Sequence, residues 1–270
     1  MKKIILTGYE GFIGRNFLEK IKAEGTEVIE VERRNSHHFT QYFNDWNDVY
    51  LILHQGAISS TTCTNLRSLQ SFNINFTEWL FEKAIEHKIP IKYASSASVY
   101  GNQKEIYNPL NYYALSKLTM DYWVEDHIDE FAFVQGFRYF NVYGKYEEKK
   151  IKENQSSPVS KFIHQAKEEG KVEIFKGSKN FFRDFICVDD VVDIVLNNNK
   201  ASGIYDLGTS KPISFFDVAE SISSCYNVEV EEINFPEHLK GKYQGYTCAK
   251  EEWDDYQFKT VKEYVKDSMD

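Results

Sequence analysis

Three side chains in the middle of the chain have the types and the spacing of an acid/base site. Tyr113 and Lys117 are four positions apart, so in a helix they lie on the same face, one turn from each other. A phenol with a pKa near ~10 is a poor base at neutral pH unless a nearby cation stabilises the phenolate, and the Lys117 ammonium can supply that charge. Ser96, 17 positions before Tyr113, follows an apolar segment and can hold a reacting oxygen.

A glycine-rich turn near the amino end predicts a dinucleotide site. Residues 4–8 are an apolar, β-branched run that predicts a buried strand, and a helical pattern follows. Gly8, Gly11 and Gly14 fall in the turn between them, where residues without Cβ let backbone N–H groups approach a pyrophosphate. The spacing G-x-x-G-x-x-G departs from G-x-G-x-x-G but serves the same geometry. Together with the acid/base residues, the turn predicts a nicotinamide-dependent catalytic site.

Charged residues after the next predicted strand bear on the choice of cofactor. Glu32 lies 18 positions past Gly14, where a carboxylate accepts hydrogen bonds from ribose hydroxyls. Arg33 and Arg34 follow directly. A carboxylate favours NAD, whereas guanidinium groups neutralise the 2′-phosphate of NADP. The sequence therefore leaves NAD and NADP as alternatives.

These motifs resemble the extended short-chain dehydrogenase/reductase superfamily, whose members act mostly on nucleotide sugars. The resemblance rests first on TGYEGFIG (7–14), ASSASVYG (94–101) and YALSK (113–117). Further segments resemble the ADP-glyceromanno-heptose 6-epimerases, and this similarity runs from about Ile4 to Tyr264. Those segments are HQGAISSTT (54–62), GFRYFNVYG (136–144), FKGSKNFFRDFICVDDV (175–191) and FPEHLKGKYQGYT (235–247).

The resemblance implies an epimerisation at C6 of the heptose with no net redox change. The carbon is oxidised to a transient ketone and reduced again from the other face, so two acid/base groups on opposite faces are needed. Tyr113 matches the family's first such group. The second is a lysine six residues after the YG glycine, which here is Lys150; Lys149 and Lys152 remain alternatives because the local match is imperfect.

The resemblance also implies a set of binding residues. On the cofactor side, besides the glycines, Glu32, Arg33 and Lys117, they are Phe12, Ile13, Gln55, Gly56, Ala57, Ile58, Ser59, Asn73 and Val142. On the substrate side, besides Ser96, they are Asn141, Ser157, His164, Phe175, Lys176, Gly177, Ser178, Arg183 and Tyr243. A planar guanidinium at Arg183 suits a diphosphate, although an ion pair with a neighbouring aspartate is an alternative.

Two stretches are shorter than is usual for the superfamily. Only fifteen residues separate Glu32 from Asp48, too few for a strand plus a helix, so we expect one short helix there. The loop from Gly101 to Asn111 normally borders the active site and is also short. We therefore expect a reduced wall at the adenine end of the cofactor and a different enclosure of the substrate.

Composition restricts the possible classes of protein. The 270 residues carry a net charge of −9, which argues against broad nucleic-acid binding. There is no long apolar run and no signal peptide, so we expect a cytoplasmic protein without a membrane span. The four cysteines have neither C-x-x-C spacing nor clustered histidines, so no metal is expected. The expected partner is a nucleotide sugar, ADP-heptose by resemblance, and the family's homopentamers imply a homo-oligomer.

The order of predicted elements indicates an α/β fold. Strands and helices alternate to about residue 141, and a further strand-helix-strand unit returns around residues 183–208. This predicts a Rossmann-type, doubly wound parallel sheet with a small, interleaved substrate-binding lobe. The Rossmann lobe would comprise residues 1–141 and 184–208, and the substrate lobe residues 142–183 and 209–270, with the chemistry between them.

Two rival functions fit parts of the same sequence. Another nucleotide-sugar epimerase, such as a UDP-hexose 4-epimerase, would keep Tyr113, Lys117 and Ser96. A 4,6-dehydratase is disfavoured because Ser96 is followed by Ala97 and Ser98 rather than by an acidic pair. A protein that binds the cofactor without catalysis is supported only by the shortened cofactor half.

Overall fold

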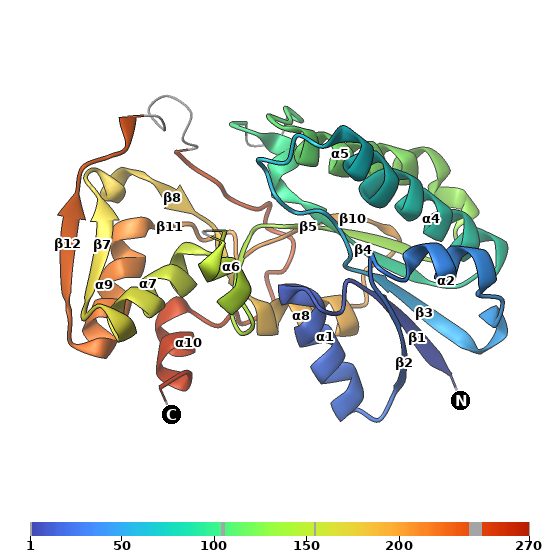
Figure 1. Cartoon of the computed structure of the whole chain (residues 1–270), viewed down its shortest axis with the longest axis horizontal. Coiled ribbons are helices and arrows are strands. Elements are labelled where there is room, and N and C mark those ends of the chain that lie inside the picture. Colours follow the sequence, from blue (N-terminus) through green and yellow to red (C-terminus); the bar gives the residue numbers. More distant parts are fainter. Residues whose placement is uncertain (1, 104–105, 154, 238–244, 270) are drawn as a thin grey trace. The chain divides into compact units, whose positions relative to one another are not determined.

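The chain divides into two compact units and passes from one to the other three times along the sequence (Figure 1). The computed structural model describes residues 2–103, 106–153, 155–237 and 245–269. The first unit comprises Met1–Tyr139 and Val192–Tyr205, and the second comprises Phe140–Val191 and Asp206–Asp270. Each unit contains its own cluster of buried hydrophobic side chains.

The first unit is built on one six-stranded sheet in the order β10-β5-β4-β3-β1-β2. Neighbouring strands from β2 through β5 all pair in parallel. The predicted Rossmann-type sheet is confirmed. The strands are β1 (Lys3–Thr7), β2 (Glu27–Val31), β3 (Val49–His54), β4 (Ile91–Ser96), β5 (Val134–Tyr139) and β10 (Gly203–Leu207).

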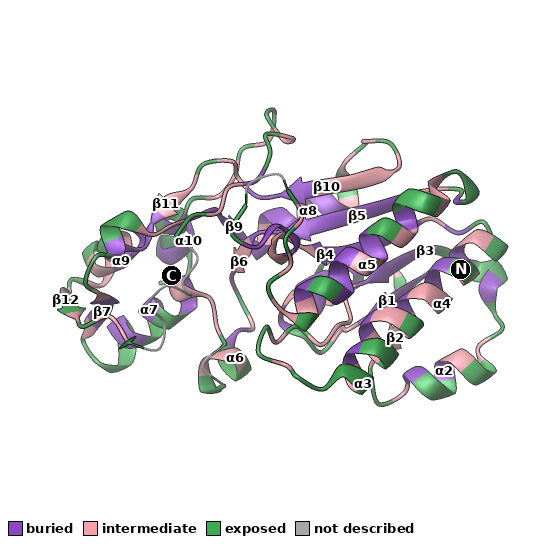
Figure 2. Ribbon diagram, turned by 90° about the horizontal axis from the view of Figure 1, so that it is seen from above, coloured by how far each residue is buried: buried purple, intermediate pink, exposed green. Residues whose placement is uncertain are grey.

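Helices connect these strands because a parallel pair needs a crossover. In Figure 1, α4 and α5 lie on one face of the sheet and α1 on the other. Strands β4 and β5 are covered on both faces and are buried almost along their whole length (Figure 2). The helices are α1 (Phe12–Ala23), α2 (Ser36–Tyr42), α3 (Leu66–Leu69), α4 (Phe76–Glu86) and α5 (Tyr112–His127), with a π-helical turn at Gln70–Asn75 and 3₁₀ turns at Trp46–Asp48, Ala97–Tyr100 and Ile128–Glu130.

The segment between β2 and β3 contains one short helix, as its length predicted. Helix α2 is followed only by a 3₁₀ turn, so β2 lies at the edge of the sheet. The usual order of this fold has a further strand outside it. Aromatic packing occupies the space instead: Phe39 and Trp46 are buried, with ring centroids 5.7 and 5.9 Å from that of Trp79 on α4.

The second unit contains three small two-stranded sheets around helices α7 and α9. Strands β6 and β9 pair in parallel, as do β7 and β12, whereas β8 and β11 are antiparallel. The elements are β6 (Asn141–Tyr143), α6 (Glu148–Lys152), α7 (Pro158–Glu168), β7 (Lys171–Phe175), β8 (Phe182–Arg183), β9 (Phe185–Cys187), β11 (Ile213–Ser214), α9 (Phe215–Tyr226), β12 (Glu229–Ile233) and α10 (Val261–Asp267), with a 3₁₀ turn at Ser178–Asn180. Helix α8 (Val188–Asn197) begins in this unit and continues in the first.

The observed boundaries differ most from the predicted ones at residue 184. The chain returns to the first unit at Val192 instead, and the other boundaries differ by two or three residues. The reason is strand pairing: β8 pairs with β11 and β9 with β6, so residues 182–187 are held in the second unit. The sequence segment predicted as a returning strand of the main sheet is therefore part of the smaller unit.

Candidate active site

The glycine turn is closely packed against the carboxyl end of β3. A Cβ on Gly8, whose φ is +71°, would lie 2.6 Å from the Gly56 Cα, and one on Gly14 would lie 2.0 Å from the Gly8 carbonyl oxygen. Both positions therefore require glycine. Helix α1 begins at Phe12, so Gly14 lies in its first turn rather than before it, and Phe12 and Ile13 precede it there. Gly11 is exposed, and its N–H donates to the Gly8 carbonyl at 3.0 Å.

Glu32 lies directly after β2 and beside this turn. Its carboxylate accepts from the Glu10 backbone N–H at 2.8 Å and from the Arg33 N–H at 3.4 Å. The Arg33 guanidinium lies over the Phe72 ring, 5.7 Å from its centroid. Arg34 donates to both carboxylate oxygens of Glu10 and to the Tyr9 hydroxyl, so its charge is already balanced.

The segment after β3 is held in place by Asn73. The Asn73 side chain accepts from the Ile58 N–H at 2.8 Å and donates to the Ile58 carbonyl at 3.1 Å. It also donates to Ser116 Oγ on α5, at 3.0 Å. Asn73 thus fixes the Ile58 backbone within the predicted cofactor segment 55–59, which includes Gly56, Ala57 and Ser59. The Oε1 of Gln55 accepts from the Tyr139 hydroxyl, whereas its buried Nε2 has no partner within the described part of the chain.

These features fit a dinucleotide. Two glycines leave no room for Cβ atoms, a carboxylate is fixed after β2, and backbone at the start of α1 is held by neighbouring strands. A helix N-terminus with close backbone approach is the geometry that a pyrophosphate needs. The cofactor residues that the sequence predicts for the first unit lie in this turn and in the segments beside it, and their contact with the cofactor stays a prediction.

Ser96, Tyr113 and Lys117 lie together at the carboxyl end of β4. Ser96 is the last residue of β4, and Tyr113 and Lys117 lie in the first turns of α5, which Asn111 caps by accepting from the Ala114 N–H. Ser96 Oγ accepts from both the N–H and the hydroxyl of Ser98, at 3.2 and 2.9 Å. Its own proton is therefore available to another acceptor, and hydrogen bonding by the Ser96 side chain lowers the pKa of Tyr113.

The protonation of Tyr113 and Lys117 is set mainly by burial. Burial raises the pKa of Tyr113; the hydrogen bond from Ser96 acts in the opposite direction, and the negative charge of Asp121 raises it further. Burial lowers the pKa of Lys117 to about 8, while Asp121 raises it. The Lys117 ammonium donates to the Ala94 carbonyl at 2.7 Å, which uses one of its three N–H groups.

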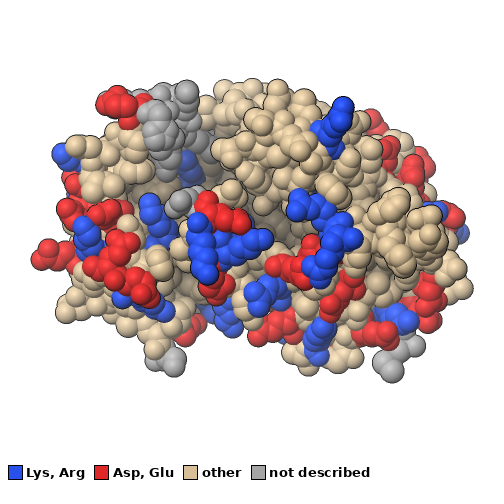
Figure 3. Space-filling view, in the orientation of Figure 1, with Lys and Arg blue, Asp and Glu red and all other residues tan. Residues whose placement is uncertain are grey.

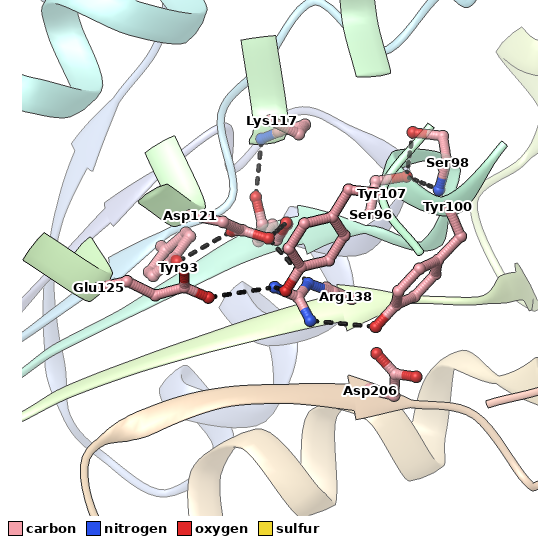
Figure 4. A network of polar contacts seen from close by, with 12 residues as sticks. Tyr93, Ser96, Ser98, Tyr100, Tyr107, Lys117, Asp121, Glu125, Arg138 and Asp206 are labelled. Atoms are coloured by element: carbon pink, nitrogen blue, oxygen red, sulfur yellow. Dashed lines mark hydrogen bonds and ion pairs between the residues drawn. The ribbon is translucent and has the colours of Figure 1, made fainter. Parts of the chain in front are cut away.

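A buried polar network beneath this site was not anticipated from the sequence (Figure 4). Asp121, one helical turn after Lys117, accepts from Tyr93, Ser95 and Arg138. The spacing of Asp121 from Lys117 was the available signal, because residues four apart share a helix face. The three strand partners could not be assigned without the register of β4 and β5.

Lys150 lies in the second unit, on the short helix α6. It is partly buried, whereas Lys149 and Lys152 are exposed. Burial lowers the pKa of Lys150, although Glu147 and Glu153 act in the opposite direction. The sequence predicted an irregular charged segment here; a helical turn forms because Glu147 is buried and accepts from Gly144, Ser157 and Ser160.

The predicted substrate residues of the second unit have differing environments. Asn141 donates to the Asp184 carbonyl and to Thr247, and Ser157 caps α7 by accepting from the Ser160 N–H. His164 is exposed on α7 rather than interior. The remaining predicted cofactor contact, Val142, pairs with Ile186 in β6 and β9.

The segment around Phe175 forms a tight turn at the end of β7. Gly177 has a φ of +88°, and the buried Ser178 hydroxyl donates to the Phe175 carbonyl at 2.6 Å. Lys176 is exposed and donates to Asn234. Arg183 is buried, donates to the Phe182 carbonyl and lies 5.5 Å from the Phe215 ring centroid. Tyr243, with Lys240 and Lys242, lies outside the described residues.

Other classes of site find no support in the described residues. Within residues 2–103, 106–153, 155–237 and 245–269, no three histidine, cysteine or carboxylate side chains gather as metal ligands. Over the same ranges, no helix has the length and apolarity needed to cross a membrane. On the face drawn in Figure 3, acidic and basic side chains alternate rather than forming a single basic surface.

Comparison with known proteins assigns the family. Residues 4–208 match the model of the NAD-dependent epimerase/dehydratase family. The chain belongs to this family. Among curated members, it is 35% identical to the ADP-L-glycero-D-manno-heptose-6-epimerases of Brachyspira hyodysenteriae and Alkalilimnicola ehrlichii, with 91% of this chain and 88% of each relative aligned.

Solved structures of epimerases have the same architecture. The ADP-L-glycero-D-manno-heptose-6-epimerase of Helicobacter pylori superposes with a TM-score of 0.83 at 25% identity, covering 99% of this chain and 95% of that one. The UDP-glucose 4-epimerase of Thermotoga maritima superposes with a TM-score of 0.80 at 18% identity, covering 99% and 100%. The latter similarity establishes the fold alone.

Proposed function

We propose that this epimerase inverts C6 of an ADP-glycero-manno-heptose, from the D-glycero to the L-glycero form. The observation that carries the proposal is the placement of Ser96 at the end of β4, with Tyr113 and the buried Lys117 one turn apart at the start of α5. That arrangement suits proton exchange with a sugar hydroxyl. The substrate class is supported by the 35% identity to the heptose epimerases over most of the chain.

Three side chains of the first unit each have a separate part in the proposed reaction. Tyr113 removes the proton from the sugar hydroxyl of one epimer, and in the reverse reaction it returns a proton to that oxygen. Ser96 holds the same oxygen through its hydroxyl, and the Lys117 ammonium stabilises negative charge on the Tyr113 oxygen. A nicotinamide cofactor, when bound, takes up and returns the two electrons of the redox step.

Lys150 is the second acid/base group in this proposal. An ordinary exposed lysine stays charged at neutral pH and cannot accept a proton. Burial lowers the pKa of Lys150, whereas Lys149 and Lys152 are exposed on the same short helix. A lysine tuned in this direction is suited to exchange a proton on the opposite face of the ketone.

We propose NAD as the preferred cofactor. Glu32 is fixed by the Glu10 N–H, where its carboxylate can accept from a ribose 2′-hydroxyl and would repel a 2′-phosphate. Arg34 is held by two hydrogen bonds to the Glu10 carboxylate, so a phosphate would have to compete with that ion pair. These contacts favour the cofactor without the 2′-phosphate.

Cofactor binding to the stripped protein tests this preference. Titration calorimetry should give a lower Kd for NAD than for NADP. Glu32→Gln should reduce the difference between the two Kd values, because it removes the repulsion between this carboxylate and the 2′-phosphate. Glu10→Gln should also reduce the difference, because Arg34 then becomes available to the 2′-phosphate. Tighter binding of NADP to the wild-type protein would contradict the assignment.

The activity itself is tested with ADP-D-glycero-β-D-manno-heptose and no added reductant. The C6 epimers are separated by chromatography, and the absorbance of reduced cofactor is followed. Formation of a mixture without net cofactor reduction is the expected result. If the substrate is unchanged while the cofactor is bound, the heptose assignment is refuted. Turnover of a UDP-hexose under the same conditions would then identify the protein as a UDP-hexose epimerase.

A further inference from the structure

Asp121 is a fully buried carboxylate in the middle of α5 that the proposed chemistry does not use. Its oxygens accept from the Tyr93 hydroxyl at 3.0 Å, from the Ser95 hydroxyl at 2.9 Å and from Arg138 Nε at 2.8 Å. Gly136 on β5 makes room for the Tyr93 ring, because a Cβ there would lie 2.5 Å from the phenol. The site for this carboxylate is therefore built by two adjacent strands.

Arg138 completes the network on its far side. Its guanidinium donates to the hydroxyls of Tyr100 and Tyr107 at 3.0 and 2.6 Å, and it lies 5.5 and 4.8 Å from their ring centroids. The Glu125 Oε1 atom lies 3.7 Å from Arg138 Nη2, and the Glu125 side chain is partly exposed. Figure 4 shows the side chains around Arg138, which come from α5 and from the segment after Ser96. A buried charge is stable only when it is paired and hydrogen-bonded in this way.

The same face of α5 carries the proposed acid/base residues. Tyr113, Lys117 and Asp121 are four residues apart, so they form a row along the helix. All three contact β4: Tyr113 through the Ser96 side chain, Lys117 through the Ala94 carbonyl, and Asp121 through the side chains on either side of Ala94. Of the three residues, Asp121 is the one that forms hydrogen bonds with two side chains of β4.

We propose that Asp121 is a positioning residue that fixes α5 on β4, so that Tyr113 and Lys117 stay aligned with Ser96, and that it places a negative charge beneath both. The proposal rests on the proposed function for the roles of these three residues. A shift of about 1 Å in such an alignment is enough to lower a rate about 100-fold. Burial raises the pKa of Asp121, while the ion pair with Arg138 and the hydrogen bonds from Ser95 and Tyr93 act in the opposite direction and favour its charged form.

The charge of Asp121 acts on both titrating groups in the same direction. It raises the pKa of Tyr113 and that of Lys117. Of the other groups near Lys117, His54 on β3 is neutral, because burial lowers its pKa to about 3, and Arg138 is always positive. Removal of the Asp121 charge should therefore lower the pKa of both Tyr113 and Lys117, and both limbs of the pH profile should move to lower pH.

Asp121→Asn is the first test, because the amide keeps the size of the side chain and removes its charge. We expect kcat to fall about 10- to 100-fold with KM nearly unchanged, and the profile of kcat/KM to move as a whole by roughly one pH unit to the acid side. Val124→Ala is the matched control, since Val124 is equally buried on α5 and outside the network. It should lower the stability without moving the profile.

A second variant tests the alignment of α5 on β4 without changing the charge of Asp121. It can be used even if Asp121→Asn does not fold. Tyr93→Phe combined with Ser95→Ala removes both contacts of Asp121 with β4 and keeps its ion pair with Arg138 on β5. We expect a lower kcat and an unmoved pH profile. A folded double variant with wild-type kcat would overturn the positioning role.

A substrate-independent measurement distinguishes this proposal from the proposed function. The tyrosinate absorbance at alkaline pH, taken as the difference between each protein and its Tyr113→Phe counterpart, follows Tyr113 alone. In Asp121→Asn this titration should move to lower pH. If wild-type protein turns over no heptose and the titration still moves, the proposed function fails and the role of Asp121 stands; an unmoved titration in the folded variant overturns that role.

Discussion

At the scale of single residues, the direction of the hydrogen bonds around Ser96 determines its part in the site. Ser98 donates twice to Ser96 Oγ, so the Ser96 proton is directed toward Tyr113 or toward a substrate oxygen in its place. The serine hydroxyl thus lowers the pKa of a phenol that burial raises. Loss of this one donor would leave Tyr113 protonated over a wider pH range.

Tyr113→Phe removes the oxygen that exchanges the proton and leaves the ring in place. We expect epimerisation to fall by about 100-fold or more, because general acid/base groups contribute about 10²- to 10⁴-fold. Cofactor affinity should change little, since the Lys117 contact with Ala94 is retained. Chromatographic assay of the epimers measures the first effect and calorimetry the second. Activity within a few-fold of wild type would remove Tyr113 from the acid/base role.

Lys150→Ala tests the second acid/base group, and Lys149→Ala is its control on the same short helix. The Lys150 variant should lose epimerisation, because the reverse face of the ketone lacks a proton donor, while the bound cofactor is retained. The control should keep nearly full activity, since Lys149 is exposed. If the two variants epimerise the substrate at equal rates, Lys150 is not the second acid/base group.

At the scale of elements, the start of α1 depends on the close approach of three backbone segments to one another: the turn at Gly8, the first turn of α1 and the segment after β3. Gly14 belongs to the helix and yet lies against the preceding turn, so the helix can begin at Phe12 only if residue 14 has no side chain. The close approach between Gly8 and Gly56 joins this turn to the end of β3 in the same way. The turn is therefore determined by packing between elements as well as by its own sequence.

Gly14→Ala should separate helix from turn and weaken the cofactor site. The new methyl group would lie 2.0 Å from the Gly8 carbonyl oxygen, so the backbone must move. We expect at least a 10-fold rise in the Kd of the cofactor, measured by calorimetry. Gly25→Ala, at the other end of α1, is the control: its φ of +76° makes alanine cost about 1 kcal/mol, but no atom lies within 4 Å. An unchanged Kd for Gly14→Ala would exclude the turn from binding.

At the scale of the whole molecule, each unit has a separate hydrophobic core, and the buried polar groups of the first unit determine how its stability responds to pH. His54 lies between Thr7 and Thr77, whose hydroxyl oxygens are 2.7 and 2.9 Å from its ring nitrogens. These contacts satisfy a neutral imidazole. Three of the four tryptophans, Trp46, Trp79 and Trp123, belong to this unit, so tryptophan fluorescence mainly follows its unfolding.

The free energy of unfolding should fall as the pH falls below the unfolded pKa of His54, which is near ~6.5. In the folded protein burial lowers that pKa to about 3, so between these values only the unfolded chain binds the proton. The loss approaches about 1.4 kcal/mol per pH unit. Urea unfolding of wild type and His54→Gln at pH 7.5, 6 and 5 should show a steeper fall for wild type. Parallel pH dependences would contradict the assignment.

The sequence alone determined the features that depend on residues close together along the chain. The glycine spacing, the Tyr113 and Lys117 pair and the shortened segment before Asp48 each predicted a local geometry. The parallel sheet and the short helix α2 followed, because hydrophobic periodicity and segment length limit what a stretch of backbone can form. The family and its reaction class were recognisable from the same motifs.

Only the tertiary structure decided which distant residues share an environment. The partners of Asp121 come from β4 and β5, and they meet it because of strand register and a glycine at position 136. Burial, which lowers the pKa of Lys117, and the pairing that keeps residues 182–187 in the second unit also depend on the packing of distant segments. Sequence spacing specifies the face of an element, whereas the groups opposite that face are specified only when the elements pack.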